Sequence, residues 1–123
     1  MAVYKNFEDL PIWKEAKDLT VQIYIITKEE KLKRDYGLSE QIRRAAISIS
    51  SNIAEGFDRS FKKEFIKSLY IAKGSVLEVR SQLFLCKELG YRDGDFSEKL
   101  LEQTRSLSRQ IGALISYLKK RNL

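Results

Sequence analysis

The sequence predicts an all-α protein, an antiparallel up-down-up-down four-helix bundle. Apolar residues recur at alternating steps of four and three along four separate segments, the spacing of helices that pack nearly parallel to one another. The connections between these segments are short, as they are between antiparallel neighbours in a bundle. The only proline in 123 residues is Pro11, so long uninterrupted helices are possible.

The first helix is expected over residues 11–28. Pro11 suits a first turn, because its φ is fixed and it lacks the N–H that a first turn leaves unbonded, and Asp9 is available as a cap. The apolar seam consists of Ile12, Ala16, Leu19, Ile23 and Ile26. The charged run that follows is expected to be a connection that ends at Gly37.

The second helix is expected over residues 39–57. Its apolar stripe consists of Ile42, Ala45, Ile49 and Ile53. Gly56 and the polar run Asp58-Arg59-Ser60 indicate where it ends.

The third helix is expected over residues 61–89, with Ser60 as its N-cap and Gly90 as its stop. Its seam consists of Phe65, Leu69, Ala72, Val76, Val79, Leu83 and Cys86. Gly74 lies well inside it, where a glycine costs about 1 kcal/mol relative to alanine. We therefore expect a neighbouring helix to approach closely at Gly74.

The fourth helix is expected over residues 96–121, opened by a capping box of Asp95 and Glu98. Its seam consists of Leu100, Thr104, Leu107, Ile111, Leu114 and Leu118. A chain of this length fits one domain, residues 1–123, that buries roughly two-thirds of its unfolded surface.

The third helix carries a second apolar line at seven-residue spacing, formed by Tyr70, Leu77 and Phe84. A bundle hides about one face of each helix, so this line predicts contact with another subunit. A broad core-facing arc that includes these residues is the alternative.

Polar residues form a second stripe on the second helix. They are Gln41, Arg44, Ser48, Asn52, Glu55 and Arg59. Ser75, Glu78 and Gln82 form a similar line on the third helix and are expected to face them, within the bundle or across a subunit boundary. The stripe has two interpretations, a binding surface or a structural network in which Glu55 pairs with Arg59 and Asn52 with Ser48.

The composition argues against an enzyme. The chain has no histidine and one cysteine, so the commonest general base and the usual metal sites are missing, and no metal or cofactor is expected. Glu55 and Glu78 could pair as carboxylates, but nothing places them beside a pocket. Cys86 lies on an apolar seam and is expected to be a buried thiol in a reducing compartment. With no signal-peptide pattern and no run of about 20 apolar residues, we expect a cytoplasmic protein without membrane contact.

The formal net charge of +6 favours association with polyanions. Basic clusters lie at Lys31, Lys33 and Arg34, at Arg43 and Arg44, at Arg59, Lys62, Lys63 and Lys67, and at Lys119, Lys120 and Arg121. We expect the first connection and the C-terminus to share one end of the bundle, with the corner between the second and third helices at the other. Aromatic side chains for stacking on bases are not clearly grouped.

A set of short motifs runs through the second and third helices: Tyr36-Gly37-Leu38, Gln41-Ile42-Arg43-Arg44-Ala45, Ser48-Ile49, Asn52-Ile53-Ala54-Glu55-Gly56, Arg59, Glu64-Phe65, Leu69, Ala72, Gly74-Ser75, Glu78 and Gln82-Leu83, preceded by Phe7, Leu10, Trp13 and Ala16. The set resembles the bacterial four-helix-bundle family of 23S rRNA-intervening-sequence proteins. The resemblance covers nearly the whole chain and is weakest after Gly90. Two prolines common in the family are absent: one before Tyr36, and one that Ser50 replaces.

The resemblance implies a left-handed antiparallel bundle that assembles as a ring, with a homopentamer as the family expectation. Some members are encoded within insertions of large-subunit ribosomal RNA genes. A related branch serves as an accessory subunit for reverse transcriptases of diversity-generating retroelements, binding nucleic acid and the enzyme.

Together these observations predict a non-enzymatic, self-assembling bundle that binds RNA or another nucleic acid through basic surface. The candidate contact residues are Arg43, Arg44, Arg59, Lys62 and Lys63. The alternative is a protein-interaction scaffold, or an accessory subunit of a partner protein, in which Gln41, Ser48, Asn52, Glu55, Ser75, Glu78 and Gln82 shape the oligomer.

Overall fold

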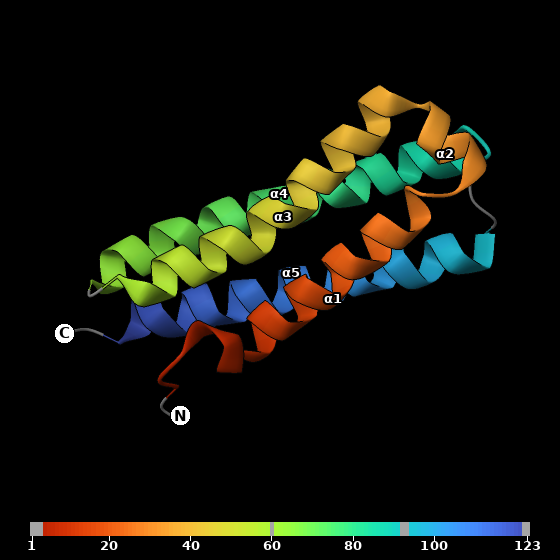
Figure 1. Cartoon of the computed structure of the whole chain (residues 1–123). Helices are drawn as coiled ribbons and strands as arrows, with labels where there is room; N and C mark the ends of the chain where they lie inside the picture. The colour runs from red at the N-terminus through yellow and green to blue at the C-terminus, as the bar shows by residue number, and fades with distance from the viewer. Residues whose placement is uncertain (1–3, 60, 92–93, 122–123) are drawn as a thin grey trace.

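The computed structural model describes residues 4–59, 61–91 and 94–121 and is an antiparallel bundle of four long helices (Figure 1). The long helices are α1 (Pro11–Ile26), α3 (Tyr36–Asp58), α4 (Lys62–Glu88) and α5 (Gly94–Lys120). Two short helices accompany them, the 3-10 helix η1 (Phe7–Asp9) and α2 (Glu30–Arg34). The predicted fold class is confirmed.

The long helices form a closed cycle. α1 packs on α3, α3 packs most extensively on α4, α4 packs on α5, and α5 returns to α1. This order places α2 and the α4–α5 connection at one end of the bundle, and the α3–α4 corner with both chain termini at the other (Figure 1). The expectation that the C-terminus shares an end with the first connection is therefore wrong.

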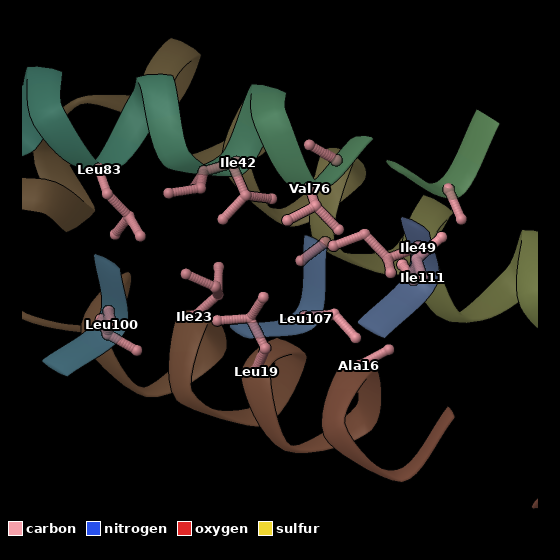
Figure 2. Close-up of a cluster of buried hydrophobic side chains, with 14 of the residues drawn as sticks. Ala16, Leu19, Ile23, Ile42, Ile49, Val76, Leu83, Leu100, Leu107 and Ile111 are labelled. Carbon is pink, nitrogen blue, oxygen red and sulfur yellow. The ribbon is translucent and has the colours of Figure 1, made fainter. Parts of the chain in front are cut away.

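The predicted seams form the core between the helices (Figure 2). Leu19 and Ile23 of α1 point toward Ile42 of α3, and all three are buried. Of the seam residues, only Phe65, Leu114 and Leu118 are partly exposed. Burying a side chain of leucine or isoleucine size contributes about 1.5–3 kcal/mol, so this core supplies most of the drive for folding.

The start of α3 differs from the prediction. The helix begins at Tyr36, and Gly37 lies in its first turn. Asp35 is the N-cap, since its Oδ1 accepts a hydrogen bond of 3.1 Å from the Leu38 backbone N–H. The expected connection also contains α2, whose Leu32 is fully buried. α2 has five residues and a single buried leucine, so its sequence shows no helical period.

Of the other predicted N-caps, two are wrong and one lies outside the described residues. Asp9 belongs to η1, and Leu10 occupies the N-cap of α1 without a side-chain bond, so this prediction is wrong. Ser60 lies outside the described residues, and Phe61 is the N-cap of α4. The capping box is also wrong, because α5 begins at Gly94 and Asp95 lies inside it.

The ends of α1 and α4 depend on local backbone geometry. Pro11 opens α1 as predicted, and the helix ends at Ile26, two residues early. Gly90 follows the C-cap of α4 with φ of 74°, a conformation that glycine adopts without strain. The Tyr91 N–H donates to the Cys86 carbonyl at 2.9 Å, which completes a Schellman motif.

The two interior glycines differ from the prediction in different ways. α3 ends at Asp58, one residue beyond the end expected near Gly56, but Gly56 is also buried where α4 comes close, and an added Cβ would lie 2.5 Å from the Ser68 Cβ. Gly74 was expected to receive a neighbouring helix, yet nothing in the described chain lies within 4 Å of a Cβ built there. Gly74 instead lies on an open surface of α4.

The second apolar line of α4 is on that open surface. Tyr70, Leu77 and Phe84 expose 48%, 57% and 44% of their surface. Core-facing Val76 and Leu83 lie on the other side of the same helix, so α4 is apolar on two faces. The broad core-facing arc is therefore wrong as an explanation of this line. No helix in the described part of the chain has the length and apolar character needed to span a bilayer.

Candidate nucleic-acid interface

Three of the predicted polar residues meet between α3 and α4. Ser75 Oγ donates a 2.9 Å hydrogen bond to Ser48 Oγ, which also accepts one of 3.1 Å from Asn52 Nδ2. The same amide donates to the Ser48 carbonyl at 2.9 Å. Ser48 is thus the shared acceptor that links the two helices, and the group is a network inside the bundle.

The remaining members of the two polar lines do not join that network. Gln41, Glu55 and Glu78 are exposed, and Gln82 is partly buried. Its Oε1 is buried with no hydrogen-bond partner among the described residues. No described ion pair joins Glu55 to Arg59, so the predicted pairing of these two residues is wrong. Arg44, the other arginine of the stripe, forms an ion pair with Glu40, one turn earlier, at 2.8 Å.

The five candidate contact residues divide between the two ends of the bundle. Arg43 and Arg44 lie near the α2 end of α3, and Arg59 follows its other end, about 24 Å away along the helix axis. Lys62 and Lys63 open α4 beside Arg59. A single flat contact does not contain all five residues.

At the corner end, the α3–α4 connection and the end of α5 come together. Lys62 Nζ donates a hydrogen bond to the Arg121 carbonyl, which joins residues far apart in the sequence. We call this region the corner cluster; it consists of Arg59, Lys62, Lys63, Lys67, Lys119, Lys120 and Arg121. Asp58 and Glu64 are the carboxylates within these segments. Positive charge therefore predominates at this end.

A depression of about 330 Å³ lies within the corner cluster. Phe57, Phe65 and Tyr117 contribute to its apolar walls. Phe57 and Phe65 pack edge to face with their ring centroids 5.9 Å apart. Phe61 lies beside them with 70% of its surface exposed. This end combines cations with an accessible aromatic ring.

At the opposite end, a groove of about 750 Å³ lies between α1, α2 and the first half of α3. We call it the α1–α3 groove. Arg43 and Arg44 line it together with Tyr24 and Tyr36. Tyr24 lies on α1 and the other three residues on α3, so this grouping of aromatic with basic side chains was not clear from the sequence.

The pattern of the 23S rRNA-intervening sequence proteins matches residues 8–113. This chain belongs to that family. The crystal structure of a protein of unknown function from the S23 ribosomal protein family of Bacteroides thetaiotaomicron is similar in fold, with a TM-score of 0.79. The two chains are 21% identical over 85% of this chain and 95% of the other, so the likeness shows the fold. Comparison with curated proteins gave no match.

The structure gives a packing role to most residues of the motif Asn52-Ile53-Ala54-Glu55-Gly56 in this chain. Asn52 belongs to the hydrogen-bonded network, Ile53 is fully buried, and Gly56 permits the close approach of α4. Glu55 is exposed and has no such packing role. Most of this motif therefore holds α3 against α4.

One buried ionisable group lies near the α2 end of the bundle. Burial raises the pKa of the Cys86 thiol to about 11, and the negative charge of Asp35 adds to this shift. Asp35 also accepts a hydrogen bond of 3.1 Å from the Tyr91 hydroxyl, which raises the pKa of Tyr91. Cys86 is fully buried, as the sequence predicted, and remains a neutral thiol at ordinary pH. In the described part of the chain, no three His, Cys, Asp or Glu side chains are grouped as metal ligands.

Proposed function

We propose that this intervening-sequence protein is a non-enzymatic bundle that binds RNA through phosphate contacts made by the corner cluster. The observation that carries the proposal is the junction of Lys62 with the Arg121 carbonyl, which brings the basic residues of the α3–α4 corner beside those at the end of α5. Within residues 58–67 and 119–121, seven cations outnumber two carboxylates, an excess that favours contact with phosphates. The start of α4 adds the partial positive charge of a helix N-terminus.

The proposal includes self-assembly through the exposed apolar line of α4. Leu77 and Phe84 are large apolar side chains in contact with solvent, and the open space over Gly74 leaves room for another chain to come close. Ile71 and Leu85 widen the same apolar surface. An assembly would present several corner clusters to one RNA, which strengthens binding through multivalency. A homopentamer is the size that the family resemblance implies.

The experiment compares Lys62→Gln/Lys63→Gln with the control Lys14→Gln/Lys99→Gln, which removes the same charge from exposed positions on α1 and α5. The probe is a labelled RNA hairpin, titrated at several salt concentrations. The corner variant should bind more weakly. Its negative slope of log K against log salt should be shallower by about 2, because each phosphate contact contributes roughly 1. Assembled mass should not change. Equal binding by the corner variant and the control would refute the assignment.

A protein-interaction scaffold is the competing function, and the exposed face of α4 is the observation that favours it. That face can contact a partner protein as well as another copy of the chain. The same experiment separates the two functions. A protein that assembles but binds no RNA hairpin at low salt is a scaffold, with the accessory-subunit role as the next to test.

A further inference from the structure

Arg43, one of the cations that line the α1–α3 groove, is held in a fixed orientation. Arg43 Nε donates a 2.7 Å hydrogen bond to Thr27 Oγ1, and the guanidinium carbon lies 4.6 Å from the centroid of the Tyr24 ring. Thr27 is itself buried, and its hydroxyl donates to the Tyr24 carbonyl at 3.1 Å. These contacts orient the guanidinium without neutralising its charge. Among the described contacts, none occupies the two terminal nitrogens of Arg43.

The groove also carries an excess of positive charge. Lys28, Lys33, Arg43 and Arg44 line it, against Glu40 as the carboxylate among its lining residues. Arg44 is paired with Glu40 at 2.8 Å, while Lys28 and Lys33 are exposed. The lining therefore has a net charge of +3, and its best-ordered cation has free donors. A phosphate is the anion that a guanidinium binds with paired donors.

Flat groups lie next to that charge. Tyr36, at the start of α3, lines the groove. It exposes 80% of its surface, a large fraction for an aromatic side chain. The Arg43 guanidinium packed on Tyr24 forms a second flat surface. Unpaired bases stack on aromatic rings and on guanidinium planes. A groove of about 750 Å³ falls within the range of small-ligand sites and can hold a nucleotide.

We propose that the α1–α3 groove binds an unpaired nucleotide, with the base stacked on Tyr36 and the phosphate bound by Arg43 and Lys33. The inference rests on the proposed function, because it takes nucleic acid as the ligand and adds a second contact that selects unpaired bases. A free nucleotide and a nucleotide within a single strand share this chemistry. The corner cluster, at the opposite end, would hold the phosphates of a structured region of the same RNA.

The test uses a six-nucleotide adenine RNA with 2-aminopurine at a central position, whose emission falls when the base stacks. Adenosine monophosphate provides the free-nucleotide arm, and the RNA hairpin reports on the corner cluster. The variant is Tyr36→Ala, and the control is Val21→Ala, which shortens an exposed apolar side chain of α1 that lines neither the groove nor the corner depression. Tyr36→Trp tests rescue, since it restores a stacking surface.

The wild-type protein should quench the 2-aminopurine emission on binding. Tyr36→Ala should weaken binding of the six-nucleotide strand by roughly 5- to 150-fold, the range for loss of one stacked base, and Tyr36→Trp should restore it. Val21→Ala should leave this binding unchanged, and hairpin binding by Tyr36→Ala should match wild type. If the monophosphate competes at similar strength and is also lost in Tyr36→Ala, the site is one for free nucleotides; if only the strand binds, it is one for a strand.

Two results would overturn the inference. One is equal quenching and affinity for wild type and Tyr36→Ala. The other is hairpin binding with no measurable binding of the strand or the monophosphate, which would leave the proposed function standing and remove the groove from it. Failure of all three probes at low salt would refute the proposed function itself.

Discussion

A Cβ atom placed on Gly56 of α3 would lie 2.5 Å from the Cβ atom of Ser68 on α4. The two helices lie this close only because residue 56 has no side chain. Gly56→Ala should therefore lower the free energy of unfolding by about 1–3 kcal/mol, since it overpacks a tight contact. The measurement is urea denaturation followed by circular dichroism.

Gly112→Ala is the matched control for this prediction. Its Cβ would lie 3.3 Å from Lys73 Nζ, the end of a flexible side chain that can move away. This variant should be neutral or more stable by up to about 1 kcal/mol, because alanine is the better helix former. Equal stability of Gly56→Ala and wild type would contradict the account of the α3–α4 contact.

Ser48 is the acceptor that Ser75 and Asn52 share. Ser48→Ala should destabilise the protein by about 1–2 kcal/mol, because it leaves the Ser75 hydroxyl without its described acceptor and the Asn52 amide with the Ser48 carbonyl alone. Ser50→Ala serves as the control, since the Ser50 hydroxyl bonds only to the backbone of its own helix, at 3.2 Å from the Ile47 carbonyl. The urea midpoint of Ser48→Ala should lie below that of Ser50→Ala. The reverse result would argue against the network.

Stability should fall at high pH because of Cys86. The unfolded thiol loses its proton near pH 9.0, while the folded pKa is about 11. Between these values the unfolded state is ionised and the folded state is not, so the free energy of unfolding should decrease by about 2–3 kcal/mol as the pH rises from 9 to 11. Below pH 9 the thiol is protonated in both states, so Cys86 adds no pH dependence to the free energy of unfolding.

Cys86→Ala isolates this contribution from that of other groups that titrate at high pH. The variant loses some stability at neutral pH through a smaller buried side chain, but its decline between pH 9 and 11 should be shallower than that of wild type. Parallel stability curves for the two proteins would show that Cys86 does not cause the loss.

The open face of α4 predicts the oligomeric state. Leu77→Glu should convert the assembly to monomers of 14.3 kDa without loss of helicity, because a carboxylate is costly to bury in an apolar contact. Val21→Glu, on an exposed position of α1, should keep the wild-type mass. Light scattering after size exclusion measures both. An unchanged mass for Leu77→Glu would remove this face from the proposed contact.

The sequence predicted the helices wherever an apolar seam continued over several turns. The predicted spacing places four residues in the core, and all four are buried: Leu19, Ile42, Val76 and Leu107. It missed α2, because one buried residue, Leu32, gives no period to detect. Asp35, a residue type that favours N-caps, was the signal in the sequence for the true start of α3, whereas Gly37 indicated a later start.

The site was less predictable from the sequence. The meeting of Ser48 with Ser75 could be anticipated, because both lie on regular helical stripes that face each other. The α1–α3 groove could not be, since Arg43 and Thr27 lie on different helices and their contact depends on how these pack. The junction of the C-terminus with the α3–α4 corner was predictable in principle: in an antiparallel bundle the second and fourth helices end on the same side.

The central claim is that phosphate contacts drive RNA binding by this protein. The most direct test is titration of a labelled RNA hairpin with the wild-type protein across a salt series, with the assembled mass recorded in each buffer. The logarithm of the binding constant should fall linearly and steeply with the logarithm of salt concentration while the mass stays constant. Absence of binding at low salt, or binding that salt does not weaken, would contradict it.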